Sequence, residues 1–305
     1  MRRVKTSLDR QIHQAVELGE NAVALKEPLS ATAVLFSGMC GSAIGGDILA
    51  NLFGRTSPVP FLVNRSSGIP HWVGPETLAV FSSYSGNTRE VLEAFAAVTG
   101  RGARALVVTS GGRLAAAAKE QNVPVLLIPA GLMPRFAVGY LTVPLIPFFR
   151  KAGWLTAEDA DCAEAAKVVR ETPKAKALSL ARTIKGRFIH LYGVSGISDA
   201  AALRWTTQLA ENTKIRASHQ VIPECFHNDI EAWPASGAGA RKSAAIFLTD
   251  KEDPAWIQTK RKFAQSLMKK AGALVFEVPS RGRSLLARMF SLVSFGDHVS
   301  LELAR

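Results

Sequence analysis

Cysteine is scarce in this sequence of 305 residues, and the three that occur, Cys40, Cys162 and Cys225, lie far apart. No two of them form a Cys-x-x-Cys pair, so neither a disulfide framework nor a zinc site is expected. Few and isolated cysteines are typical of proteins that stay in a reducing compartment. They therefore predict a cytoplasmic location.

Long hydrophobic runs are missing as well. A membrane helix needs about 18 or more uninterrupted apolar residues. The longest candidate, 136–149, contains Pro144 and Pro147 and is followed by Arg150. Three of the first five residues are basic, but no apolar segment follows them, so they do not have the pattern of a secretory signal. The sequence predicts a protein without membrane segments.

Acidic residues are outnumbered. The chain has 25 Asp and Glu against 37 Lys and Arg, a formal net charge of +12. The basic residues are scattered and accompany no RNA or DNA motif, so nucleic acid is not an expected partner. A basic surface that attracts small anionic molecules, or that only keeps the protein soluble, explains the charge with fewer assumptions.

Short apolar runs alternate with helical patterns along the first half of the chain. Strands are expected at 33–37, 59–64, 78–82, 104–109 and 125–129, and helices at 7–25, 42–52, 88–98, 113–121 and 135–152. Apolar strands that alternate with helices are typical of a parallel sheet covered on both faces. This half therefore predicts a doubly wound α/β domain.

The second half repeats that plan. Strands are expected at 188–194, 244–249 and 274–278, and helices at 156–184, 199–212, 254–270 and 285–303, with Pro173 as a break or a helix start. The Ala/Gly run 235–240 is expected to be a surface loop. The chain is long enough for two cores, and it crosses between them near 151–155. We therefore expect two doubly wound parallel-sheet domains, 1–153 and 154–305.

Glycine and hydroxyl residues follow several of the predicted strands. The segment 82–88, Ser-Ser-Tyr-Ser-Gly-Asn-Thr, carries more hydroxyl groups than the capping of one helix needs. Ligands of parallel sheets bind at the carboxyl ends of the strands, where glycine lets an anion approach the backbone and helix N-termini favour negative charge. The loops 38–42, 109–112 and 133–135 have similar chemistry, although each alone reads as an ordinary turn. The sequence predicts a phosphate-binding loop at 82–88.

Two sets of residues resemble known enzymes. The SYSGNT loop, with the upstream segment GMCGSAIGGD at 38–47, resembles the sugar isomerase (SIS) fold, whose domains are flavodoxin-like. The segments ENTK (211–214), VIPE (221–224) and HNDIEAW (227–233) are similar to the signature of bifunctional phosphoglucose/phosphomannose isomerases. The tract SGGRL (110–114) and the pair Pro134-Arg135 fit the same family. The resemblance implies two SIS-type domains and interconversion of glucose 6-phosphate, with mannose 6-phosphate as a further substrate, and fructose 6-phosphate.

The resemblance also implies roles for particular residues. Ser83, Ser85 and Thr88 would bind the sugar phosphate, and Gly41 and Ser42 would line the sugar pocket. Arg135 would stabilise the enediolate, Glu211 would move the proton between the two carbons, and His227 would open the sugar ring. In this family the corresponding histidine comes from the partner subunit, so a homodimer is expected.

Two positions depart from the family pattern. Cys40 stands where the family has glycine, and its Cβ is expected to strain the turn after the first strand. Family members continue beyond the motif seen here as Gly296-Asp297-His298-Val299-Ser300 into a segment that supplies a threonine and a lysine. No residue of this sequence matches either of them.

The chemistry of the residues agrees with such a reaction. Aldose–ketose exchange needs one base that takes a proton from a carbon and returns it to the neighbouring carbon, and a partly buried carboxylate suits that task. Histidine suits ring opening near neutral pH, and arginine keeps its charge beside an enediolate. The reaction requires no cofactor, and no His/Cys/carboxylate cluster has the spacing of metal ligands.

Each candidate also has an ordinary interpretation. Glu211 fits a solvated residue in the last turn of a helix, and His227 fits a residue of a surface loop. Arg135 would begin a helix, where a positive charge is locally unfavourable, and this points to a nearby anion.

Three functions stay open at the level of sequence. The first is the glucose 6-phosphate isomerase. The second is a non-catalytic phosphosugar-binding or regulatory module, and the third is an isomerase of another phosphosugar.

Overall fold

The computed structural model describes residues 7–21 and 31–305 of the chain. It divides into two compact units, Met1–Lys167 and Val168–Arg305. Each unit contains one parallel sheet with helices on both faces, which confirms the predicted class of two doubly wound α/β domains. The predicted division between residues 153 and 154 falls inside the first unit, so the assignment of the two halves stays a prediction.

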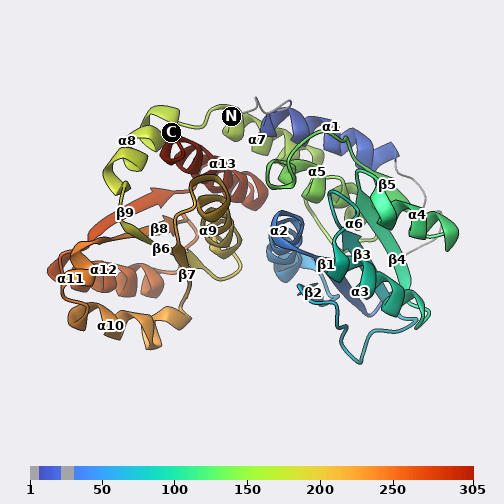
Figure 1. Cartoon of the computed structure of the whole chain (residues 1–305), viewed down its shortest axis with the longest axis horizontal. Coiled ribbons are helices and arrows are strands. Elements are labelled where there is room, and N and C mark those ends of the chain that lie inside the picture. The colour runs from blue at the N-terminus through green and yellow to red at the C-terminus, as the bar shows by residue number, and fades with distance from the viewer. Residues whose placement is uncertain (1–6, 22–30) are drawn as a thin grey trace. The chain divides into compact units, whose positions relative to one another are not determined.

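The first unit is built on a sheet of five parallel strands in the order β2-β1-β3-β4-β5 (Figure 1). Its strands are β1 (Ala33–Gly38), β2 (Phe61–Asn64), β3 (Thr77–Ser82), β4 (Arg104–Thr109) and β5 (Val125–Leu127). This order is the flavodoxin-like one. Every residue of β3 is buried, because strands on both of its sides and helices on both faces cover it. The carboxyl ends of β1 and β3 lie side by side, with Gly38 paired with Ser82.

Helices cover both faces of this sheet. The first layer contains α2 (Cys40–Thr56), α5 (Val138–Thr142), α6 (Leu145–Lys151) and α1 (Leu8–Asn21). On the other face, α3 (Arg89–Thr99) and α4 (Gly112–Glu120) pack over strand residues such as Leu35, Phe81 and Val107. This burial removes the apolar side chains of the strands from water and stabilises the unit.

Two predicted helices of this unit differ from the structure. The helix expected at 135–152 is wrong as a single element, because the segment forms a short 3₁₀ helix η1 (Pro134–Phe136), then α5, then α6. Pro144, which has no backbone N–H to donate, stands between α5 and α6. The helix expected at 7–25 ends at Asn21, and residues 22–25 lie outside the described residues.

The second unit has a sheet of four parallel strands in the order β7-β6-β8-β9. Its strands are β6 (Phe188–Val194), β7 (Ala217–Ile222), β8 (Ser243–Thr249) and β9 (Leu274–Pro279). The sequence predicted β6, β8 and β9. It missed β7, whose sequence Ala-Ser-His-Gln-Val-Ile is half-exposed at the edge of the sheet and lacks a continuous apolar run.

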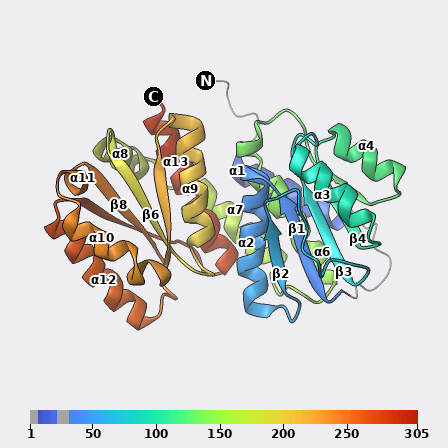
Figure 2. The same cartoon turned by 60° about the horizontal axis from the view of Figure 1, so that its bottom comes forward.

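The helices of the second unit form two groups (Figure 2). Helices α8 (Lys174–Ile184), α9 (Asp199–Thr213) and α13 (Leu285–Leu303) pack together on one side of the sheet. The other side carries α10 (Asp229–Ala235), α11 (Ala238–Arg241) and α12 (Ala255–Lys270). Between β7 and α10 lies a 3₁₀ helix, η2 (Glu224–His227).

Two further predictions for this part of the chain can be compared with the structure. Helix α7 (Asp159–Arg170) ends before Pro173, and α8 begins directly after this proline, at Lys174. The predicted break is therefore confirmed. The surface loop predicted at 235–240 is confirmed only at 236–237, because Ala235 ends α10 and Ala238 begins α11, with Gly237 at positive φ between them. Such short helices depend on packing against the rest of the unit, here through the buried Trp233 and Ala240. Within residues 7–21 and 31–305, no helix has the length and apolarity to cross a membrane.

Candidate active site

The hydroxyl-rich loop after β3 lies at the carboxyl edge of the first sheet. Ser83 is 1% exposed, and its Oγ lies 2.9 Å from Oγ1 of Thr88. Thr88 directly precedes the first residue of α3. Ser85, which lies between Ser83 and Thr88 in sequence, is exposed. Hydroxyl groups that meet at a helix N-terminus can donate to an anion, and the helix dipole favours its negative charge. The arrangement suits a phosphate group.

Glycine permits the close packing of this loop against the loop after β4. Gly86 has φ of +66° and Gly112 has φ of +75°. A Cβ on Gly86 would lie 1.8 Å from the carbonyl oxygen of Gly111, and one on Gly112 would lie 2.3 Å from that of Ser85. The backbone N–H of Leu114 donates to the carbonyl oxygen of Gly86 at 2.8 Å. Only glycine fits at both positions, and the two loops therefore form one rigid surface.

The first turn of α2, after β1, and the segment after β5 meet the same surface. The hydroxyl oxygen of Ser42 accepts a hydrogen bond from the backbone N–H of Tyr84 at 3.3 Å. A Cβ on Gly41 would lie 3.3 Å from the carbonyl oxygen of Pro134 and 3.4 Å from Cα of Arg135. The Tyr84 hydroxyl donates to the carbonyl oxygen of Pro129 at 2.9 Å, which ties the loop after β3 to the segment after β5.

All the residues predicted for the first unit therefore lie along one edge of its sheet. They are Gly41, Ser42, Ser83, Ser85, Thr88 and Arg135. The guanidinium of Arg135 stands over the ring of Phe136, with 5.1 Å from Cζ to the ring centroid, a cation–π distance. Cys40 has φ of +48°, which agrees with the strain expected in the turn after β1, and its side chain is exposed. A left-handed conformation costs such a residue about 1–2 kcal/mol.

Glu211 lies in the last turn of α9, a helix that polar contacts fasten to α13. Its neighbour Asn212 donates from Nδ2 to Oγ of Ser300 at 3.0 Å. Two turns earlier, the buried guanidinium of Arg204 donates to both carboxylate oxygens of Asp297, at 3.1 and 2.8 Å. Such a paired contact fixes direction as well as distance. The half-buried Glu211 is thus carried on a helix that cannot rotate freely.

His227 lies at the other edge of the same sheet. Helix α9 runs back across the sheet to the start of β7, so Glu211 lies near the amino end of that strand. His227 follows its carboxyl end, is exposed, and closes η2. Six strand residues separate the two edges, about 20 Å at 3.3 Å per residue. Within one unit, the carboxylate and the imidazole do not share a site.

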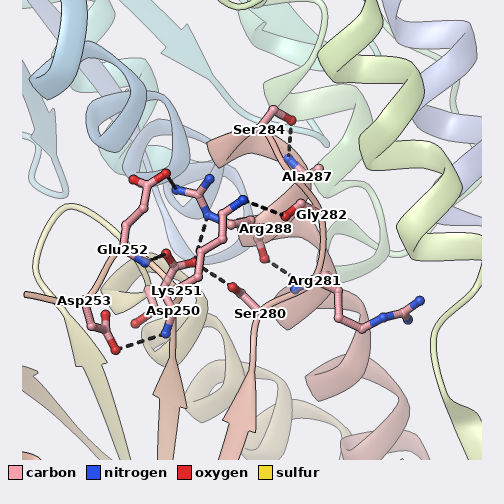
Figure 3. A network of polar contacts seen from close by, with 12 residues as sticks. Asp250, Lys251, Glu252, Asp253, Ser280, Arg281, Gly282, Ser284, Ala287 and Arg288 are labelled. Atoms are coloured by element: carbon pink, nitrogen blue, oxygen red, sulfur yellow. Dashed lines mark hydrogen bonds and ion pairs between the residues drawn. The ribbon is translucent and has the colours of Figure 1, made fainter. Parts of the chain in front are cut away.

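The second sheet carries different chemistry after its third and fourth strands (Figure 3). The carboxylate of Asp250, after β8, accepts from Nε of Arg288 at 2.9 Å and from the hydroxyl of Ser280 at 2.6 Å. Glu252 pairs with Nη2 of the same arginine at 2.8 Å. The side chains of Asp250 and Arg288 are 1% and 3% exposed. Asp250 and Glu252 already neutralise the charge of Arg288, so this arginine is not available to bind an anionic ligand. This edge therefore differs from the hydroxyl-lined edge of the first unit.

Metal ligands are not gathered at these edges. In the part of the chain that the structure describes, no group of three or more His, Cys, Asp or Glu side chains could hold a metal ion.

Sequence reasoning missed one cluster beside the predicted histidine. Asp229, two residues after His227, accepts hydrogen bonds from Tyr192, Gln220 and Trp233. Asp229 and Trp233 belong to the HNDIEAW segment, which was the one signal available. Gln220 lies on the missed strand β7, so its proximity to Asp229 could not be predicted.

Comparison with protein families and curated proteins gives consistent results. The family profile described as the bacterial phospho-glucose isomerase C-terminal SIS domain matches residues 173–305. The bifunctional phosphoglucose/phosphomannose isomerase of Caldicellulosiruptor bescii is 35% identical, over 98% of this chain and 91% of that protein. The protein of the same name from Thermoplasma acidophilum is 34% identical, over 89% of this chain and 83% of its own length.

Solved structures share the fold at low sequence identity. The tagatose-6-phosphate ketose/aldose isomerase from Escherichia coli aligns with a TM-score of 0.72 and 16% identity, covering 97% of this chain and 92% of that one. The glucosamine-6-phosphate deaminase from Thermotoga maritima aligns with a TM-score of 0.70 and 19% identity, covering 97% of this chain and 92% of its own. At these identities the likeness shows the fold alone, and it agrees with the two parallel sheets described above.

Proposed function

This chain belongs to the bifunctional phosphoglucose/phosphomannose isomerase family, and from that premise we propose that it is an isomerase of hexose 6-phosphates. It interconverts glucose 6-phosphate and mannose 6-phosphate with fructose 6-phosphate by moving a proton between two neighbouring carbons. The observation that carries the proposal is the hydroxyl-lined edge of the first sheet, in a chain that is 35% identical to such an isomerase over 98% of its length.

The phosphate of the substrate binds at the loop after β3. The hydroxyls of Ser83, Ser85 and Thr88 donate to its oxygens, and the N-terminus of α3 favours its charge. Gly41 lets the start of α2 approach the Pro134–Arg135 backbone, and Gly41 and Ser42 line the sugar pocket next to this loop. All of the proposed substrates carry this phosphate group. The energy of binding it helps to orient the carbons at the reacting end of the sugar.

Proton transfer is the task of Glu211. The carboxylate takes a proton from one of the two carbons and returns it to the other, through an enediolate. Arg135 keeps its charge at every relevant pH and stabilises the negative oxygen that develops. The family resemblance assigns these roles, and the fastening of α9 to α13 supports a fixed carboxylate.

Ring opening is the task of His227, supplied by the partner subunit of a homodimer. The separation of about 20 Å between the two edges of the second sheet supports this assignment, because one subunit cannot bring its own imidazole to its own Glu211 through that sheet. A cytoplasmic location and the absence of nucleic-acid partners stay predictions.

A coupled assay with fructose 6-phosphate tests the function, and the variant Glu211→Gln tests the base. We expect turnover by the wild-type protein and a loss of turnover of about 10⁴-fold or more in E211Q, with binding of the phosphosugar largely kept. A matched control is Glu231→Gln, which removes the same charge from an exposed position on α10. Retained turnover in E211Q would reject the assignment of the base. Binding without any turnover by the wild type would favour the non-catalytic phosphosugar-binding module instead.

A further inference from the structure

The carboxylate of Asp229 joins three elements of the second unit. Its Oδ2 accepts a hydrogen bond from the hydroxyl of Tyr192, on β6, at 2.6 Å. Its Oδ1 accepts from Nε2 of Gln220, on β7, at 3.0 Å, and Nε1 of Trp233, one turn along α10, lies 3.3 Å from Oδ2. Both oxygens are therefore used inside the protein, and the direction of the carboxylate is fixed.

The donors of this cluster are themselves held in place. Tyr192 and Gln220 are register partners in the β6–β7 pairing, which brings their side chains to the same position on the sheet. The ring of Tyr192 stacks on Phe247 with centroids 4.5 Å apart, and its hydroxyl accepts from Nε1 of Trp233 at 3.1 Å. Burial, with a further contribution from Asp229, raises the pKa of Tyr192, so its hydroxyl keeps the proton that it donates.

The turn that carries His227 lies between this cluster and a second anchor. On its N-terminal side, Cys225 is 3% exposed and Phe226 packs against the apolar core of the unit. On its C-terminal side, Asn228 caps α10 by accepting from the backbone N–H of Asp229. His227 is exposed between the two anchors. The turn is thus fixed on both sides, while its imidazole faces outward.

We propose that Asp229, held by Tyr192 and Trp233, is a positioning residue that fixes the turn carrying His227 in place for ring opening. The inference rests on the proposed function. Proton transfer from an imidazole to a ring oxygen depends on alignment to within a fraction of an ångström, and side chains with fixed supports keep that alignment. Asp229 does not itself move a proton in this proposal, because both of its oxygens accept hydrogen bonds from protein groups.

Two substitutions remove the support without touching the substrate. Asp229→Asn replaces one acceptor oxygen by an NH₂ group, which sets donor against donor at Tyr192 or Gln220. Tyr192→Phe removes one donor and keeps the stacked ring. Glu231→Gln, on the same helix and exposed, is the control for the loss of a charge on α10.

The measurements are kcat with fructose 6-phosphate and the Kd of 5-phosphoarabinonate, an open-chain compound that needs no ring opening. For Asp229→Asn we expect kcat to fall about ten- to a hundredfold, with a smaller fall for Tyr192→Phe and none for Glu231→Gln. The Kd should stay unchanged in all three, which also shows that the variants fold. A change of kcat without a change of Kd separates positioning from a loss of structure.

A double variant tests whether Asp229 acts through His227. In a His227→Gln background, Asp229→Asn should lower kcat little further, because the group that it positions is already absent. The proposal is overturned if the two substitutions multiply, or if both single variants at 192 and 229 keep wild-type kcat. If the wild type itself shows no turnover, the proposed function fails and not merely this inference, so the two failures are distinguishable.

Discussion

Gly86 offers a sharp test of how the proposed phosphate-binding loop is built. In Gly86→Ala the new Cβ would lie 1.8 Å from the carbonyl oxygen of Gly111, whereas real contacts of this kind stay above 3.0 Å. The loops after β3 and β4 must then separate by the difference, 1.2 Å. Overpacking of this kind typically costs about 1–3 kcal/mol, and the left-handed backbone costs alanine about 1 kcal/mol more. We therefore expect the free energy of unfolding to fall by about 2–4 kcal/mol.

Gly102→Ala is the matched control. Gly102 has φ of +73°, but the nearest atom to its added Cβ is Cγ of Pro75, at 3.8 Å. In this variant only the left-handed backbone conformation is unfavourable, so the free energy of unfolding should fall by about 1 kcal/mol. Urea denaturation gives both values, and titration with 5-phosphoarabinonate should show weaker binding in Gly86→Ala alone, because its shifted loop carries Ser83 and Thr88. Equal stability of the two variants with unchanged binding would refute the claim that the two loops form one rigid surface.

Two further predictions concern the second unit. Arg288→Met leaves the carboxylate of Asp250 buried without its cation, and we expect a loss of about 3–5 kcal/mol in the free energy of unfolding. Arg305→Met, which removes an exposed ion pair with Glu302, should cost less than about 1 kcal/mol, and similar losses in the two variants would contradict the argument. Burial lowers the pKa of three histidines of this unit, His190, His219 and His298. Below their ordinary value of 6.5 the unfolded chain binds more protons than the folded one, so the urea midpoint should fall as the pH decreases through 6.5, and a rise would show the sign to be wrong.

Much of the fold could be predicted because buried parallel strands are continuous apolar runs. The strands Thr77–Ser82 and Ser243–Thr249 are buried along their whole length, and both were recognised. Strand β7 was missed because an edge strand needs fewer apolar residues, and its polar side chains resemble those of a loop. The helix expected at 135–152 failed at Pro144, whose effect on a helix depends on the surrounding packing.

The candidate site could be predicted only where its residues are close in sequence. The loop at 82–88 contains its own hydroxyls, so its position at a sheet edge followed from the strand before it. The cluster around Asp229 depends on the register between β6 and β7, which brings Tyr192 opposite Gln220. Such long-range pairs leave no local pattern. Likewise, the buried pair of Asp250 and Arg288 joins residues that lie 38 positions apart.

The central claim is that the hydroxyls of the first unit bind the phosphate of a hexose phosphate. A crystal structure of the protein with 5-phosphoarabinonate tests it most directly. We predict the phosphate within hydrogen-bond distance of Ser83, Ser85 and Thr88, and a Glu211 carboxylate that is shielded from bulk water. A phosphate bound elsewhere, or a Glu211 side chain that faces bulk water in that complex, would contradict the account.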